Sequence, residues 1–189
     1  MNEPRTLTEA IARLQDKLSG LDWTDQVFGR AAVYEEKLPG QDKGQIKPMV
    51  YDPASRDYID ARPSDKYDCV IFFTATAPEK NDWSQEKGFG HAQSHIIRPR
   101  RAVTLYGWIN LEKFEQFDDG SGFPELIKLD LKQALKTTTG CVASIGDYQD
   151  ESMKEAFKPF QVSDLDRRYD LWPYACFSLQ LTVYTIEKR

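Results

Sequence analysis

Residues 172–186 read WPYACFSLQLTVYTI, and this stretch decides how the chain folds. Apolar side chains recur at every second position over more than ten residues, with smaller or polar ones between them. Alternation with a period of two is typical of a long β-strand with one buried face. We therefore predict a strand here whose core-facing side chains are Ala175, Phe177, Leu179, Leu181 and Val183.

The composition is typical of a single globular domain. The chain has 189 residues, of which 40% are hydrophobic and 29% are charged, so it can bury a core without metals or disulfides. Its net charge of −5 disfavours a protein that wraps nucleic acid. No apolar run has the length of a membrane span. The first residues, MNEPRTLTEA, lack the pattern of a signal peptide, so we expect synthesis and residence in the cytoplasm.

Two amphipathic helices are predicted. Thr6 and Glu9 have the spacing of a capping box, and apolar residues then recur with helical spacing as far as Leu18. The apolar stripe of this first helix packs on a sheet or faces a neighbouring subunit. A second helix is predicted at Pro124–Lys136, because proline is favoured in the first turn and an apolar stripe follows.

Further strands are predicted between and after these helices. Four segments have strand patterns, namely Gln26–Glu35, Asp68–Thr76, Arg101–Asn110 and Thr139–Gly146. Short edge segments are also expected near Met49–Tyr51 and Tyr58. Loops are expected at Leu38–Pro48 and Pro159–Tyr169, with a short helix at Glu151–Phe157. The element order predicts an α+β fold, with a mainly antiparallel sheet and two main helices packed on one face. We expect one domain over residues 1–189, with a long loop or arm near 78–98.

Residues suited to catalysis or metal binding do not form a signature. His91 and His95 are four residues apart, but they lie in a polar loop with no obvious third ligand. The turn at Asp118 and Asp119 has too few oxygen ligands for calcium, and Asp147 and Asp150 are interpreted in the same way. The cysteines lie far apart among apolar residues, which indicates buried structural thiols at Cys69, Cys141 and Cys176. We therefore predict no catalytic residue, no metal and no cofactor.

Partner contacts are predicted from exposed aromatic and basic residues. Residues 98–101 read RPRR, a basic cluster in an acidic chain that suits phosphate or an acidic patch on a partner. The same cluster could instead be a charged strand edge that blocks unwanted pairing. Aromatic side chains in loops and at strand ends are suitable anchors at interfaces. The predicted contact residues are Trp83, Phe89, Arg98, Arg100, Arg101, Trp172 and Tyr174.

The order of elements resembles that of the tail terminator or tail-completion proteins of the bacteriophage neck and tail. An amphipathic helix ending at Leu18 precedes strands that include YDCVIFFTAT and RAVTLYGWIN. A helix over Phe123–Leu135, another strand and the final strand entered through Trp172-Pro173-Tyr174 follow. The resemblance covers most of the chain, with Glu36–Tyr67 and Pro78–Arg98 as elaborations beyond it.

This resemblance implies a structural protein of the virion. Members of that family form hexameric rings that cap a finished tail tube and join it to the head. A homo-oligomeric ring with tail-tube and neck proteins as partners is thus expected, and a mildly acidic ring would let DNA pass without sequence-specific binding. Two alternatives remain from the residues alone. One is a non-catalytic binding module for a protein or small ligand, and the other is an enzyme that gathers Asp, His and Tyr side chains from distant loops.

Overall fold

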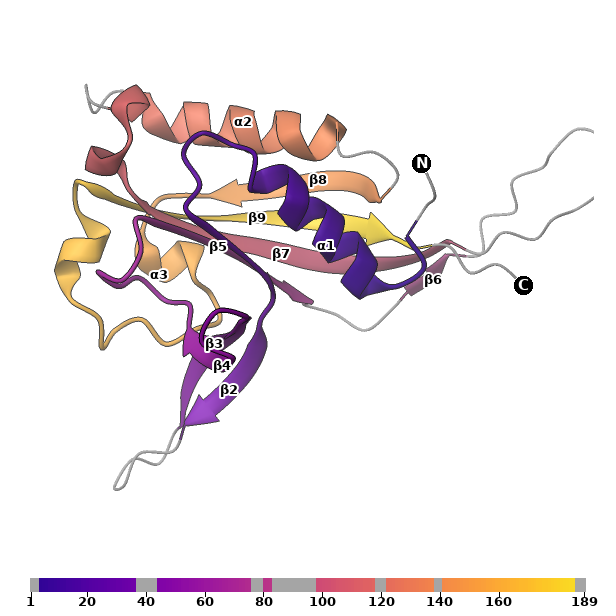
Figure 1. Cartoon of the computed structure of the whole chain (residues 1–189), viewed down its shortest axis with the longest axis horizontal. Coiled ribbons are helices and arrows are strands. Elements are labelled where there is room, and N and C mark those ends of the chain that lie inside the picture. The colour runs from indigo at the N-terminus through magenta and orange to yellow at the C-terminus, as the bar shows by residue number, and fades with distance from the viewer. Residues whose placement is uncertain are drawn as a thin grey trace, which may run out of the picture.

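The computed structural model describes residues 4–36, 44–75, 80–82, 98–117, 122–137 and 141–185. Within them, a six-stranded sheet forms the centre of the molecule (Figure 1), with strands in the order β1-β5-β7-β9-β8 and with β6 paired to β7. β1 runs parallel to β5, and the other pairings in this sheet are antiparallel. The bounds are Gln26–Arg30 for β1, Cys69–Ala75 for β5, Lys80–Asp82 for β6, Arg98–Asn110 for β7, Val142–Gln149 for β8 and Tyr174–Tyr184 for β9.

A smaller antiparallel sheet and several helices complete the described part of the fold. The small sheet has the order β2-β3-β4, with bounds Ala32–Glu36, Gln45–Asp52 and Asp57–Asp60. The α-helices are α1 at Leu7–Leu18, α2 at Phe123–Thr137 and α3 at Met153–Ala156, and short 3-10 turns are η1 at Leu111–Lys113, η2 at Glu115–Phe117 and η3 at Arg167–Asp170. Helices combined with mainly antiparallel strands confirm the predicted α+β class.

The final strand confirms the prediction made from residues 172–186. β9 is shorter than that stretch, and it lies between β7 and β8. Four of the five predicted core side chains are buried, and the fifth, Ala175, is half-buried. The prediction of a single buried face is incomplete, because Cys176 and Ser178 on the opposite face are buried as well. A strand covered on both faces needs a second layer of protein, which the sequence pattern did not indicate.

Helices α1 and α2 bury their apolar residues in one cluster with the sheet. The Thr6 hydroxyl accepts a hydrogen bond from the backbone N–H of Glu9 at 3.1 Å, as expected for an N-cap. The indole N–H of Trp23, which follows α1, donates to Asp130 on α2 at 3.0 Å. The cluster combines both helices with side chains of three strands, including Ile71, Leu105 and Phe177. Burial of this apolar area is the main stabilising term for this half of the core.

The opposite face of the sheet has its own apolar cluster. Phe72, Tyr106 and Trp108 come from β5 and β7, and they pack against α3, the segment after it and the small sheet. The prediction of a polar linker at Pro159–Tyr169 is wrong in this respect, because its residues Phe160, Val162 and Tyr169 are buried. These apolar residues are too few and too irregularly spaced to give a helix or strand signal, so the polar residues between them dominated the pattern.

The predicted strand at Gln26–Glu35 is in fact two strands in different sheets. β1 ends at Arg30, and Ala31 donates its backbone N–H to the carbonyl of Phe73 at 2.8 Å before β2 begins at Ala32. β2 then pairs with β3 and leaves the main sheet. The predicted loop at Leu38–Pro48 is also too long, because β3 already begins at Gln45. Pairing with distant strands decides both boundaries, so local residue preferences could not locate them.

The predicted loop or arm near 78–98 contains a strand. Lys80–Asp82 forms β6, which pairs with residues 98–100 at the start of β7. This pairing makes β6 a continuation of β5 along the same partner strand, and it carries the sheet to its far end (Figure 1). Residues 76–79 and 83–97, with His91 and His95, lie outside the described residues, as do Asp118 and Asp119 of the predicted turn.

A buried arginine joins the small sheet to the segment that follows α3. Arg62 is only 6% exposed, and its guanidinium pairs with Asp60 at 2.7 Å and with Asp164 at 2.8 Å. It also donates to the carbonyl of Gln161 at 2.6 Å. Hydrogen bonds to these two carboxylates hold the guanidinium charged and raise its pKa against the effect of burial. The network connects segments that are far apart in the chain, because Arg62 and Asp164 are separated by 102 positions.

Candidate functional site

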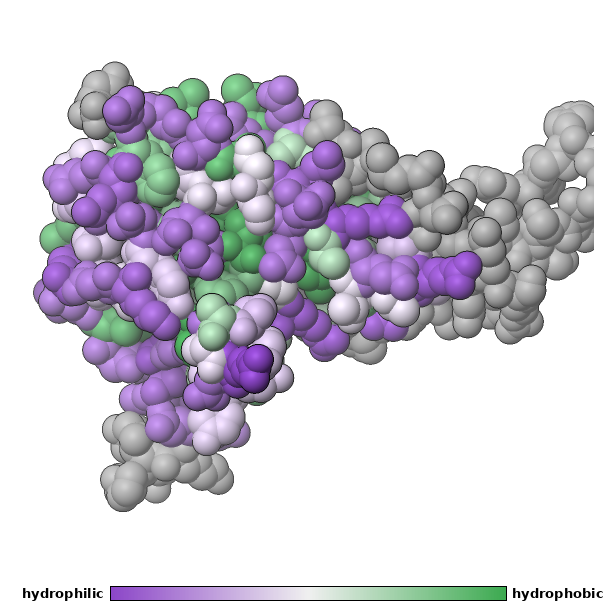
Figure 2. Space-filling view, viewed as in Figure 1, coloured by the Kyte–Doolittle hydropathy of each residue, from purple (hydrophilic) through white to green (hydrophobic). Residues whose placement is uncertain are grey.

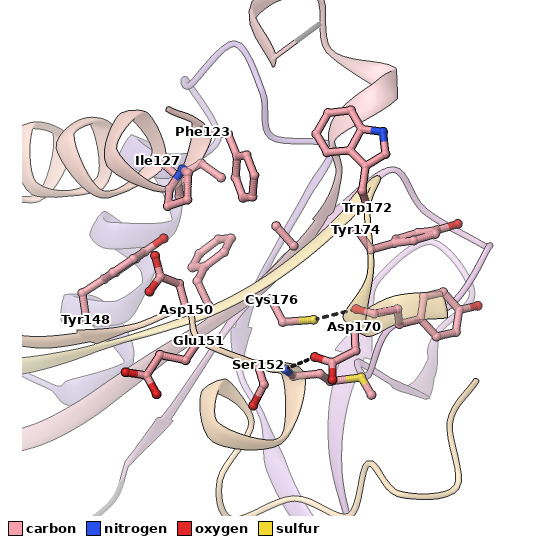
Figure 3. A pocket seen from close by; sticks show the side chains of 15 residues that line it. Phe123, Ile127, Tyr148, Asp150, Glu151, Ser152, Asp170, Trp172, Tyr174 and Cys176 are labelled. Carbon is pink, nitrogen blue, oxygen red and sulfur yellow. Dashed lines mark hydrogen bonds between the residues drawn. The ribbon is translucent and has the colours of Figure 1, made fainter. Parts of the chain in front are cut away.

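A cleft opens where β8 separates from β9. The β8–β9 ladder ends at the pair Gln149 and Ser178, whereas the β7–β9 ladder continues to Asn110 and Tyr174. Residues 174–177 therefore pair with β7 on one side and border a cavity of about 210 Å³. We call this cavity the β8–β9 cleft. Its walls come from the start of α2, residues 148–153, η3 and the start of β9 (Figure 3).

Aromatic side chains form much of the wall of the β8–β9 cleft. The rings of Phe123 and Trp172 lie 6.2 Å apart between centroids, and Tyr148 stacks on Phe177 at 6.2 Å. Trp172 remains 49% exposed, so its ring is open to contact at the mouth of the cleft. Figure 3 shows Phe123 and Trp172 facing each other across the upper part of the cavity. Aromatic faces of this kind bind apolar groups and also cations.

Carboxylates make the β8–β9 cleft acidic. Asp150, Glu151 and Asp170 all line it, and Asp170 accepts the backbone N–H of Met153 at 2.6 Å, which fixes the start of α3. The pKa of Asp150 is raised by partial burial, and Glu125 and Glu151 raise it further, while Lys128 lowers it. Burial is the main cause of this rise, because it disfavours the charged form of the carboxyl group. The described lining residues include these three acidic side chains and no Lys, Arg or His. The cleft therefore favours a positively charged group.

A hydrogen-bonded cluster fixes two of the tyrosines in this wall. Asp65 accepts hydrogen bonds from the hydroxyls of Tyr169 at 3.1 Å and Tyr174 at 3.3 Å, and it pairs with Arg168. The Arg168 hydrogen bond, followed by that of Tyr169, lowers the pKa of Asp65 below its usual range. Tyr169 and Tyr174 also make an edge contact, with centroids 4.9 Å apart. These bonds hold the entrance to β9 in one orientation.

The basic cluster lies at the opposite end of the same strands. Residues 98–101 begin β7, and Arg100 pairs in register with Tyr184 near the end of β9. Arg100 is exposed and Arg101 is half-buried. The cleft borders the other end of the β7–β9 ladder, at Asn110 and Tyr174. At about 3.4 Å per residue, the two ends of the ladder are roughly 30 Å apart.

The structure brings together only part of the predicted contact set. Trp172 and Tyr174 both line the β8–β9 cleft. Arg100 and Arg101 lie at the far end of the sheet with the backbone of Arg98, so they belong to a separate surface. Trp83 and Phe89 lie outside the described residues. A contact role for all seven residues stays a prediction.

Several residues of the cleft were missed by the sequence reasoning. Phe123, Tyr148 and Asp150 come from α2, β8 and the turn after β8, and they meet only in the folded chain. At the level of the sequence, Asp150 is considered only as a calcium ligand, and the local pattern gives it no role. The acidic stretch DYQDE at 147–151 directly after a strand was the one available signal.

Exposed tyrosines on the small sheet were also missed. Tyr34, Tyr51 and Tyr58 are each about half exposed, at 54%, 49% and 56%. Tyr51 and Tyr58 are cross-strand partners whose rings make an edge contact at 5.6 Å. In Figure 2, most of the visible surface is hydrophilic, and hydrophobic residues gather mainly in the middle of the body. Tyr51 and Tyr58 thus form an exposed aromatic pair suited to contact, and Tyr34 is exposed elsewhere on the same small sheet.

A larger and shallower groove of about 540 Å³ lies against β7, β8 and β9. Its lining mixes hydroxyl side chains such as Thr104, Ser178 and Thr182 with apolar residues, and it also includes Glu155 and Lys158. These last two residues pair with each other at 2.7 Å. The groove offers hydroxyl groups but no nucleophile with an adjacent base among its described lining residues.

The cysteines are buried and free of disulfides, as predicted. Burial raises the pKa of the Cys69, Cys141 and Cys176 thiols, which keeps them protonated and unreactive. The described residues contain no group of three or more His, Cys, Asp or Glu side chains that could hold a metal ion. No described helix combines the length and apolar character needed to span a bilayer.

Comparison with known proteins adds no assignment. No protein-family model matches the chain, and no curated protein matches it.

Proposed function

We propose that this chain is a structural protein that forms a ring at the head-proximal end of a phage tail, as a tail terminator or neck component. The observation that carries the proposal is the contrast between the two ends of the β7–β9 ladder. One end borders an acidic, aromatic cleft, and the other carries the arginines of β7. A closed ring is built from heterologous contacts, which require two different and complementary patches on each subunit.

The hairpin of β6 and β7 supports the same proposal. β7 has 13 residues and β5 has 7, so β7 extends past β5 and pairs there with β6. An extension of the sheet at one end gives each subunit a projecting surface that can reach a neighbour. The helix face is a further candidate, because Leu126 and Leu129 of α2 are 43% and 60% exposed. The two main helices packed on one face would then form one layer of the ring.

Light scattering across a concentration series, followed by negative-stain microscopy of the largest species, tests the proposal. A single closed ring, expected to contain six subunits by resemblance to the tail terminators, would support it. A monomer at every concentration, or open fibres without a closed form, would contradict it. A monomer would also favour the alternative of a binding module, and a ligand screen would be the next measurement.

A further inference from the structure

We infer that the β8–β9 cleft is the socket of the subunit interface, and that it receives Arg100 from a second copy of this chain. The inference rests on the proposed ring function, and it names the contact that would close the ring.

The size of the cleft suits one side chain. Its volume of about 210 Å³ is below the range of about 300–1,000 Å³ that is typical of pockets for small molecules and cofactors. The cleft is open at the mouth, where Trp172 is 49% exposed. A single long side chain that enters from a neighbouring protein matches this volume better than a free ligand does.

The chemistry of the cleft selects a cation with a planar group. Asp150, Glu151 and Asp170 line the cavity, and the described lining residues include no Lys, Arg or His. Lys128 lies toward the ring of Tyr148, with 5.6 Å between its Nζ atom and the ring centroid. Phe123 and Trp172 add aromatic faces. A guanidinium group can stack on an aromatic ring and bind a carboxylate through two hydrogen bonds, which an ammonium group cannot do.

The position of Arg100 makes it the matching group on the next subunit. Arg100 is exposed, and it lies at the opposite end of the β7–β9 ladder from the cleft. On one subunit, the β8–β9 cleft and the basic cluster are roughly 30 Å apart, at about 3.4 Å per residue along the ladder. Arg100 therefore cannot reach the cleft of its own subunit. Two such ends can meet only between copies, and repeated contacts of this kind generate a ring when the rotation from one copy to the next closes. Charge complementarity of this type sets the register between subunits.

A charge-swap experiment tests the inference. Asp150→Lys and Arg100→Glu are made separately, and the assembly of each variant is measured by light scattering at low salt. Each variant should weaken assembly by at least about tenfold in dissociation constant. An equimolar mixture should restore assembly, because every contact in an alternating ring then joins opposite charges. Asp150→Asn should give a smaller loss than Asp150→Lys.

Matched controls come from α1. Asp16→Lys and Lys17→Glu change the charge by the same amounts at exposed positions of α1, away from the cleft. They should leave assembly unchanged, alone or mixed. Thermal unfolding of all variants separates lost assembly from lost folding.

The outcomes separate this inference from the proposed function. If the unmodified chain forms a ring and neither Asp150→Lys nor Arg100→Glu weakens it, the socket assignment is overturned while the ring proposal stands. If both variants weaken assembly but the mixture does not restore it, the pairing of these two residues is overturned. If the unmodified chain forms no ring, the proposed function fails, and the socket assignment fails with it.

Discussion

The two faces of the central sheet are covered in different ways. On one face, the buried residues of β5, β7 and β9 share an apolar cluster with residues of α1 and α2. On the other face, the cover consists of the small sheet and the irregular segment after α3, and hydrogen bonds fix it in place. Trp108 donates to the carbonyl of Ala61 at 3.2 Å, and Arg62 joins Asp60 to Asp164. The first cover thus depends on apolar area, and the second depends also on a few polar contacts between distant segments.

The largest expected effect is on the helix-covered face. Phe177→Ala should lower the free energy of unfolding by about 3–5 kcal/mol, because the buried ring is replaced by a cavity. The Phe177 ring lies over Gly107, where an added Cβ would come within 2.3 Å of the ring. Denaturant unfolding followed by tryptophan fluorescence measures the loss.

The Gly107 contact supplies the control for this prediction. Gly107→Ala should destabilise the unmodified protein by about 1–3 kcal/mol through overpacking. In the Phe177→Ala background it should cost clearly less, because the space is empty. Equal losses of stability in the two backgrounds would show that the Phe177 ring does not restrict the space for a side chain at Gly107.

The second prediction concerns the polar cover. Arg62→Ala should lower the free energy of unfolding by about 2–3 kcal/mol, less than for a fully buried pair because both partner carboxylates are about a third exposed. Lys47→Ala, which removes a single and less buried ion pair with Glu36, should cost less, about 1 kcal/mol. Similar losses of stability in the two variants would contradict the claim that the Arg62 network holds the small sheet and the segment after α3 in place.

The third prediction compares how readily the two faces open. Cys69 is buried on the helix-covered face and Cys176 on the opposite face. We expect a thiol reagent to label both slowly in the native protein, and Cys176 first, because its cover contains fewer regular elements. Pulse labelling followed by digestion and mass spectrometry shows which of the two cysteines reacts first. Labelling of Cys69 before Cys176 would reverse the comparison.

The smallest expected effect is at the exposed cluster beside the cleft. Asp65 has a lowered pKa in the folded state, so its contribution to stability is present above the unfolded value of about 3.9 and is lost as the pH falls through the lower folded value. Asp65→Asn should therefore lower stability slightly at pH 7, and its difference from the unmodified protein should shrink as the pH falls below about 4. Thermal unfolding between about pH 2 and pH 7 measures it, with Asp16→Asn as the control. Parallel curves for the unmodified protein and Asp65→Asn would contradict the assignment.

The candidate site was only partly predictable from the sequence. Trp172 and Tyr174 stand at the entrance to a strand whose pattern is clear, so they could be expected at an edge of the sheet. Phe123 and Tyr148 join them only because the start of α2 and the end of β8 lie beside the start of β9. No local pattern records that meeting, since the residues lie in separate elements.

The sequence by itself determined the elements with strong local periodicity. β9, α1 and α2 follow from repeats of 2 and 3.6 residues, and the burial of the cysteines follows from their apolar neighbours. Only the tertiary structure decided that the chain divides at Ala31 into strands of two sheets, and that the segment after α3 covers the second face. It also decided where β8 leaves β9 to open the cleft. The physical reason is that periodicity is a property of neighbouring residues, whereas strand partners and covering segments are chosen by contacts between residues far apart in the chain.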